Sequence, residues 1–202
     1  GQLRHPAGLA VDDKGSLWVA DSWNARLGQF TADGTFIAWA PDSFNRPTDL
    51  CWDEQRGGLW VAETGASRIV RLGADGSFLF AFGKGELDFP ESLALDADGN
   101  IVVADTGNGL VKRFTPSGVL LDVLGMGESG RVPPLRYPQA VATGPAGDML
   151  IAERDGAGLR FFRNTHRSLQ PLNSPLPDGH GCGFPCDIEM VTGLIRTIGT
   201  TT

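Results

Sequence analysis

Short apolar runs, separated by turns rich in glycine and aspartate, make up most of the chain. Near the N-terminus these runs are Leu9–Val11, Leu17–Ala20, Arg26–Thr31 and Phe36–Ala40. The turn at 32–34 reads Ala-Asp-Gly, and glycine supplies the positive φ that such turns need. No segment keeps the 3.6-residue periodicity of an amphipathic helix. The pattern therefore predicts four short antiparallel strands per unit and little helix.

The same unit recurs four times. Each copy contains an apolar phrase that ends in an acidic residue, and successive acidic residues lie 42, 42 and 48 positions apart. These residues are Asp21, Glu63, Asp105 and Glu153. A proline precedes each phrase, at Pro6, Pro47, Pro90 and Pro138. Four-stranded units of about 42 residues are typical of a β-propeller, so we expect an all-β propeller of antiparallel blades.

We predict four full blades, at about residues 3–43, 44–86, 87–134 and 135–172. Residues 173–202 contain a Gly/Pro-rich loop and then a segment expected to form part of a fifth blade. An incomplete ring leaves blade edges open, and open edges favour pairing with another chain. The interpretations are a fragment, an open arc, or an arc completed by self-association through those edges, and we favour a fragment or an open arc.

The first phrase carries the motif Pro-x-x-Leu-Ala-Val-Asp-x-x-Gly-x-Leu-Trp-Val-Ala-Asp-x-x-Asn-x-Arg, which resembles an NHL repeat. Its residues are Pro6, Leu9, Asp12, Gly15, Asp21, Asn24 and Arg26. The second unit keeps Arg68, the third has Leu110 at the arginine position, and the fourth shows no matching arginine. The resemblance covers Leu3 to about Leu172 and implies a propeller that generally closes with six blades. It implies a fold and not an activity, because such folds host many functions.

Charge and composition exclude some function classes. The chain has 202 residues, 17 basic and 24 acidic side chains, and a formal net charge of −7. Nucleic-acid binding needs a basic patch, so this balance argues against it. No apolar run approaches the roughly 18 residues of a membrane helix, and residues 1–15 show no secretory signal. The sequence therefore does not identify the cellular compartment of the protein. The spacing of Cys182 and Cys186 does not decide between a disulfide and two thiols.

In a propeller, the loop that enters a blade and the loop between its second and third strands lie on the same face. The four acidic residues are therefore expected on one face with the longest linkers. They could form a carboxylate ring that holds a divalent cation such as calcium or zinc. Alternatively, each could cap its own turn and pair with the arginine five residues later, as in Asp21 with Arg26. Recurrence in every blade favours capping, because a site used once need not be copied.

Four other residues on this face are predicted to bind a partner: Trp23, Arg46, Arg136 and Arg154. Trp23 lies in a loop where the second and third blades carry glycine, so it is a candidate binding anchor. The alternative is that it packs on a neighbouring loop. The three histidines, His5, His166 and His180, are not expected to converge on one metal. Tryptophan and phenylalanine at equivalent repeat positions are expected in the core: Trp18, Trp60, Phe30, Phe114 and Phe162.

We interpret the chain as a scaffold that binds a protein or a small molecule through its loop face. The alternative is a metal-dependent lactonase- or lyase-like enzyme with a site at the channel mouth. Residues Asp49–Gly65 resemble a blade of gluconolactonase and regucalcin, which implies a divalent metal in the channel. We find no nucleophile elbow and no dinucleotide fingerprint, so catalytic residues stay unassigned and a non-enzymatic role is favoured. RNA binding, which some NHL proteins show, ranks third.

Overall fold

The computed structural model describes residues 2–126, 134–155, 158–164 and 169–171, and these form four four-stranded sheets. Blade one contains β1 (Pro6–Val11), β2 (Leu17–Asp21), β3 (Arg26–Phe30) and β4 (Phe36–Trp39). Blade two contains β5 (Pro47–Trp52), β6 (Leu59–Glu63), β7 (Arg68–Leu72) and β8 (Phe78–Phe82). Blade three contains β9 (Pro90–Leu95), β10 (Ile101–Asp105), β11 (Leu110–Phe114) and β12 (Leu120–Leu124). Blade four contains β13 (Pro138–Thr143), β14 (Met149–Glu153), β15 (Leu159–Asn164) and β16 (Leu169–Pro171).

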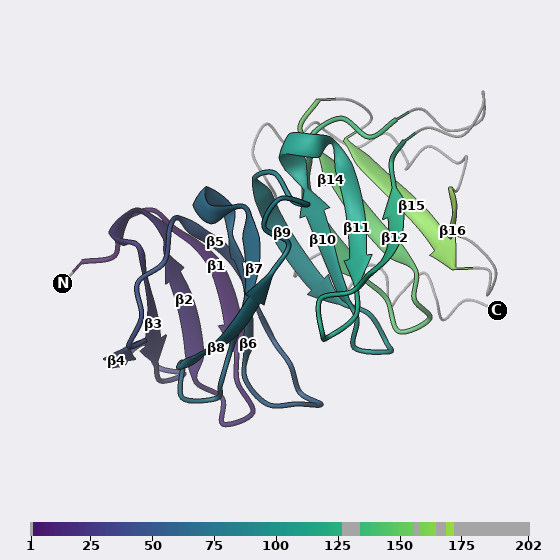
Figure 1. The fold of residues 1–202 in the computed structure, drawn as a ribbon. Coiled ribbons are helices and arrows are strands. Elements are labelled where there is room, and N and C mark those ends of the chain that lie inside the picture. The colour runs from purple at the N-terminus through teal and green to yellow at the C-terminus, as the bar shows by residue number, and fades with distance from the viewer. Residues whose placement is uncertain (1, 127–133, 156–157, 165–168, 172–202) are drawn as a thin grey trace.

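Each blade is an antiparallel meander, and the four blades follow one another around an arc (Figure 1). The prediction of an all-β propeller with four-stranded blades is confirmed. The predicted partial fifth blade, together with Cys182, Cys186, His166 and His180, lies outside the described residues. Within the described residues, no helix is long and apolar enough to cross a membrane.

A short 3-10 helix, which the apolar pattern does not predict, follows the second strand in three blades. These helices are η1 (Ser22–Asn24), η2 (Thr64–Ala66) and η3 (Thr106–Asn108). Each ends at a residue in the left-handed conformation, namely Ala25, Ser67 and Gly109. This turn reverses the chain into the third strand and places the residues of each η helix on the loop face.

The core lies between blades rather than within them. Trp18 packs with blade two, Trp60 with blade three, and Phe162 with blade three from the other side, and all three are at most 4% exposed. Phe114 is also fully buried, as predicted. Phe30 is only partly buried, because its side of blade one faces no other blade among the described residues.

That uncovered flank of blade one is apolar. Leu9 and Val11 are 54% and 52% exposed, whereas Leu50 and Trp52, at the same positions in blade two, are 4% and 9% exposed. The difference arises because blade one covers the second pair. Self-association through an open flank of this kind stays a prediction.

Neighbouring first strands approach each other closely. A Cβ added to Gly8 in β1 would lie 2.5 Å from the Cα of Asp49 in β5. Only glycine allows the two backbones to lie so near. The first strands of all four blades lie side by side along one groove.

Candidate functional site

A buried carboxylate connects each linker to the blade that follows it. In blade one, Asp21 is fully buried at the end of β2. One of its oxygens accepts the backbone N–H of Arg4 at 2.6 Å, and the other accepts Asn24 Nδ2 and Arg26 Nε, both at 2.8 Å. Burial alone would raise the pKa of Asp21, but these hydrogen bonds and the positive charge of Arg26 outweigh it. The pKa of Asp21 is therefore lower than usual.

The other three blades repeat this arrangement. Glu63 accepts the backbone N–H of Asn45 at 2.6 Å, Asp105 accepts that of Asp88 at 2.7 Å, and Glu153 accepts that of Arg136. Each carboxylate also pairs with a cation from the third strand. In blades one and two this is the arginine five residues later, Arg26 or Arg68.

Blades three and four carry the cation two positions farther along. Lys112 Nζ lies 2.7 Å from Asp105, and Arg160 Nε lies 2.7 Å from Glu153. These blades have no arginine at the fifth position, as the sequence shows, and the structure supplies the cation from the seventh position instead. In blades one and two that seventh position holds Gly28 and Val70.

The four acidic residues are thus bound separately, each in its own blade. Among the described residues, no group of three or more His, Cys, Asp or Glu side chains is placed to hold a metal ion. The divalent-cation hypothesis for Asp21, Glu63, Asp105 and Glu153 stays a prediction.

Acid should unfold the chain partly through Asp21. Its folded-state pKa is depressed, so its ionised form stabilises the fold above the unfolded-state pKa of about 3.9. This stabilisation is lost as the pH falls through the lower folded-state value. We expect the melting temperature to fall between pH 5 and pH 3, and to fall less steeply in an Asp21→Asn variant. Melting curves by circular dichroism test this, and equal slopes for both proteins would contradict it.

The residue immediately before each blade's first proline has a positive φ. These residues are His5, Arg46, Phe89 and Tyr137, with φ values of 54°, 51°, 46° and 51°. Proline normally favours an extended conformation in the residue before it, so each blade imposes this geometry. Two kinds of hydrogen bond fix it. The carboxylate accepts the preceding N–H, and a backbone N–H that follows the second strand donates to the same segment, from an η helix in blades one to three and from Arg154 in blade four. All four side chains are exposed on the loop face.

Trp23 is held among neighbours on this face. Its ring stacks on His5 with centroids 4.9 Å apart and an interplanar angle of 5°, and the Arg4 guanidinium carbon lies 5.2 Å from its centroid. It remains 59% exposed. A shallow pocket of about 400 Å³ joins Trp23 to Arg46, so the structure brings two of the four predicted binding residues together.

The other two predicted residues lie in blade four, at the opposite end of the described arc (Figure 1). The Arg154 guanidinium carbon lies 4.6 Å from the Tyr137 ring centroid, and the exposed Arg136 directly precedes Tyr137. Sequence reasoning missed His5, Tyr137 and Arg4 as members of this surface. The available signal was their position, one or two residues before the repeated proline.

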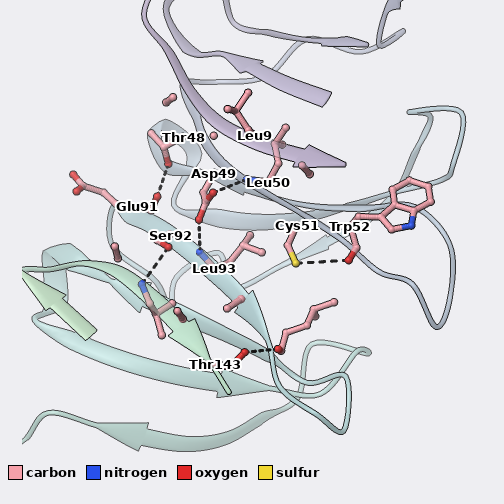
Figure 2. A pocket seen from close by; sticks show the side chains of 18 of the residues that line it. Leu9, Thr48, Asp49, Leu50, Cys51, Trp52, Glu91, Ser92, Leu93 and Thr143 are labelled. Carbon is pink, nitrogen blue, oxygen red and sulfur yellow. Dashed lines mark hydrogen bonds between the residues drawn. The ribbon is translucent and has the colours of Figure 1, made fainter. Parts of the chain in front are cut away.

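A groove of about 1040 Å³ runs along the first strands β1, β5, β9 and β13. Figure 2 shows hydrogen bonds that join neighbouring strands along its wall. Thr48 Oγ1 donates to the Glu91 carbonyl at 3.0 Å, and the Leu93 N–H donates to Asp49 at 2.9 Å. Because these contacts bridge adjacent blades, the wall is a rigid surface.

Among the residues that the structure describes, Glu91 is one of four acidic residues that line the groove, together with Asp49, Glu54 and Asp96. Gln139 Nε2 donates to Glu91 Oε2 at 3.2 Å, and Arg46 Nη2 lies 3.9 Å from Glu91 Oε1. Cys51 also lines the groove, but burial raises the pKa of its thiol to about 12. At neutral pH the thiol is therefore protonated and is a poor nucleophile.

The fold and the repeated linker carboxylates define a β-propeller arc. The NHL repeat family model matches residues 3–30 and 87–114, which contain the first three strands of blades one and three, so these two blades carry NHL repeats. No curated protein matches the chain significantly.

Solved structures with the same fold include two lyases and a nidogen/laminin complex. Virginiamycin B lyase from Staphylococcus aureus superposes with a TM-score of 0.68 at 18% identity, over 88% of this chain and 58% of that one. A streptogramin B lyase gives 0.65 at 18%, over 85% and 55%. A chain of a nidogen/laminin complex gives 0.66 at 20%, over 81% and 61%. At these identities the similarity shows the fold alone, and the chain spans less than two thirds of each of these structures.

Proposed function

We propose that this chain is a scaffold that binds a protein partner through its loop face. The observation that supports this most directly is Trp23, which is 59% exposed whereas the other four tryptophans are partly or fully buried. Leaving so large an apolar ring in water is unfavourable unless a partner covers it. Tryptophan and arginine are also the residues most enriched at binding hot spots.

The scaffold beneath this surface favours binding without rearrangement. The linker residues are fixed by buried carboxylates, and the first strands are hydrogen-bonded from blade to blade. A preorganised surface loses little conformational entropy when it binds. The nidogen/laminin structure is a protein complex, which is consistent with this role for the fold. The adjoining groove is large enough for a small-molecule partner.

A photo-crosslinking experiment tests this proposal. Replacing Trp23 with p-benzoylphenylalanine should give one dominant cross-linked protein in an extract of the source cells. The same substitution at Lys14, an exposed residue in the β1–β2 turn on the opposite face, serves as the matched control. Equal cross-linking at both positions, or none at Trp23, would count against the loop face.

Alanine variants then measure the contribution of this surface. Once the partner is purified, replacing Trp23 and Arg46 together by alanine should weaken its binding at least about 30-fold, as expected for hot-spot residues. Lys14→Ala should leave the affinity unchanged. Isothermal titration calorimetry supplies both values, and an unchanged affinity in the double variant would contradict the proposal.

The metal-dependent enzyme stays an alternative prediction. The names of the lyase structures describe those proteins, and the fold they share with this chain does not carry their chemistry. A rise in melting temperature on adding calcium or zinc, reversed by a chelator, would support the alternative.

A further inference from the structure

The shallow pocket between blades one and two has an unusual charge for this protein. Its lining residues are Arg4, Ser22, Trp23, Ala25, Asn45 and Arg46. Two of them are cationic and none is acidic, in a chain with a net charge of −7. Asp21, which accepts the Arg4 N–H, is fully buried and accepts three hydrogen bonds from its own blade, and Glu63, which accepts the Asn45 N–H, is buried as well. The pocket is therefore a local positive site.

The backbone conformation at each of the two arginines positions its side chain. The Arg4 N–H donates to Asp21 at 2.6 Å, and its carbonyl accepts the Trp23 N–H at 3.2 Å. The Arg4 guanidinium stacks near Trp23, and among the described residues no carboxylate lies within ion-pair distance of it. Arg46 has the left-handed backbone conformation, and the ion pair that it forms with Glu91 is long at 3.9 Å.

We propose that this pocket binds a carboxylate of an acidic segment in the protein partner, a proposal that rests on the function proposed above. Guanidinium groups bind carboxylates through paired, charge-assisted hydrogen bonds. The Trp23 ring forms an apolar wall beside the two cations, and it can pack against the methylene groups of a glutamate side chain.

A carboxylate fits better than a polyphosphate chain. Nucleic acids need an extended run of cations to replace their counterions, and this site offers two arginines. The overall negative charge of the chain repels a polyanion at longer range. A single acidic side chain needs only the local positive field, which acts over about 10 Å at moderate salt.

Tryptophan fluorescence gives a direct test, because Trp23 is the one tryptophan of five that is largely exposed. The probe is a short acetylated and amidated peptide of alternating glutamate and glycine, titrated at neutral pH and low salt. We expect a saturable change in Trp23 emission, weakened by added salt. The matching glutamine–glycine peptide should give no change. Inorganic phosphate and an oligouridylate are titrated in parallel.

Variants assign the effect to the two arginines. Arg4→Gln and Arg46→Gln should each raise the Kd for the glutamate peptide about tenfold. Lys14→Gln, which removes the same charge from the opposite face, should leave the Kd unchanged. Glu91→Gln should tighten binding because it releases Arg46. All four variants should keep the wild-type melting temperature, which shows that any loss is local.

Three results would overturn the inference. The first is the absence of a saturable response to the glutamate peptide, and the second is a Kd that neither arginine variant changes. The third is a tighter response to phosphate or to the oligouridylate than to the glutamate peptide. Cross-linking at Trp23 could still identify a protein whose binding does not depend on Arg4 or Arg46. That result would support the proposed function and rule out the carboxylate site.

Discussion

Replacing Trp60 by alanine should lower the free energy of unfolding by about 3–5 kcal/mol. Trp60 is fully buried in the cluster between blades two and three. Its ring contacts Phe80 and Phe82 edge-on, the Arg71 guanidinium carbon lies 4.9 Å from its centroid, and its indole N–H donates to Asp53 at 3.1 Å. Alanine would leave a large cavity and remove the partner of a buried carboxylate.

Urea unfolding followed by circular dichroism measures this effect. The matched control is Trp23→Ala, the same substitution at a 59% exposed position, which should change stability by no more than about 0.5 kcal/mol. Trp60→Phe should be intermediate, because it keeps much of the ring volume but loses the hydrogen bond to Asp53. Equal losses at Trp60 and Trp23 would mean that the inter-blade contacts do not stabilise the arc.

Removing Asp105 should cost a similar amount, about 3–5 kcal/mol in an Asp105→Ala variant. Asp105 is fully buried and binds the Asp88 N–H at 2.7 Å, Asn108 Nδ2 at 2.9 Å and Lys112 Nζ at 2.7 Å. The Lys112 side chain is only 10% exposed, so its charge would remain nearly desolvated without a counter-ion. The linker that enters blade three would also lose its anchor.

A double-mutant cycle separates the ion pair from the linker contact. Asp105→Ala combined with Lys112→Met removes both charges and should recover at least about 1 kcal/mol relative to Asp105→Ala alone. The control is Asp13→Ala at an exposed turn position, which should leave the unfolding midpoint unchanged. No recovery in the double variant would show that the hydrogen bond to the linker, and not the unpaired charge, dominates the loss.

The fold could be predicted from the sequence because its determinants are local and repeated. Runs such as Leu17–Ala20 and Leu59–Ala62, closed by glycine turns, recur at a nearly constant spacing. A single apolar run of this length is ambiguous between strand and helix, but the register of several copies is not. Trp18 and Trp60 could be assigned to the core for the same reason, since equivalent positions in a repeat have equivalent neighbours.

The binding surface was harder to predict, because its members depend on backbone angles that the motif does not report. His5 and Tyr137 are exposed on the loop face by a left-handed conformation before proline, which sequence rules disfavour. The cation partners of Asp105 and Glu153 moved from the fifth to the seventh position, where a strict motif comparison does not find them. In both cases a tertiary hydrogen bond, and not local preference, decides the geometry.

The left-handed residue before each proline has an evolutionary consequence. His5, Arg46, Phe89 and Tyr137 share one backbone conformation, and they differ widely in size and charge. Each is held by main-chain hydrogen bonds and by the carboxylate that anchors its linker, so the side chain itself contributes little to folding. These four positions can therefore vary independently of the scaffold, and a new binding specificity requires only substitutions at sites whose orientation is already fixed.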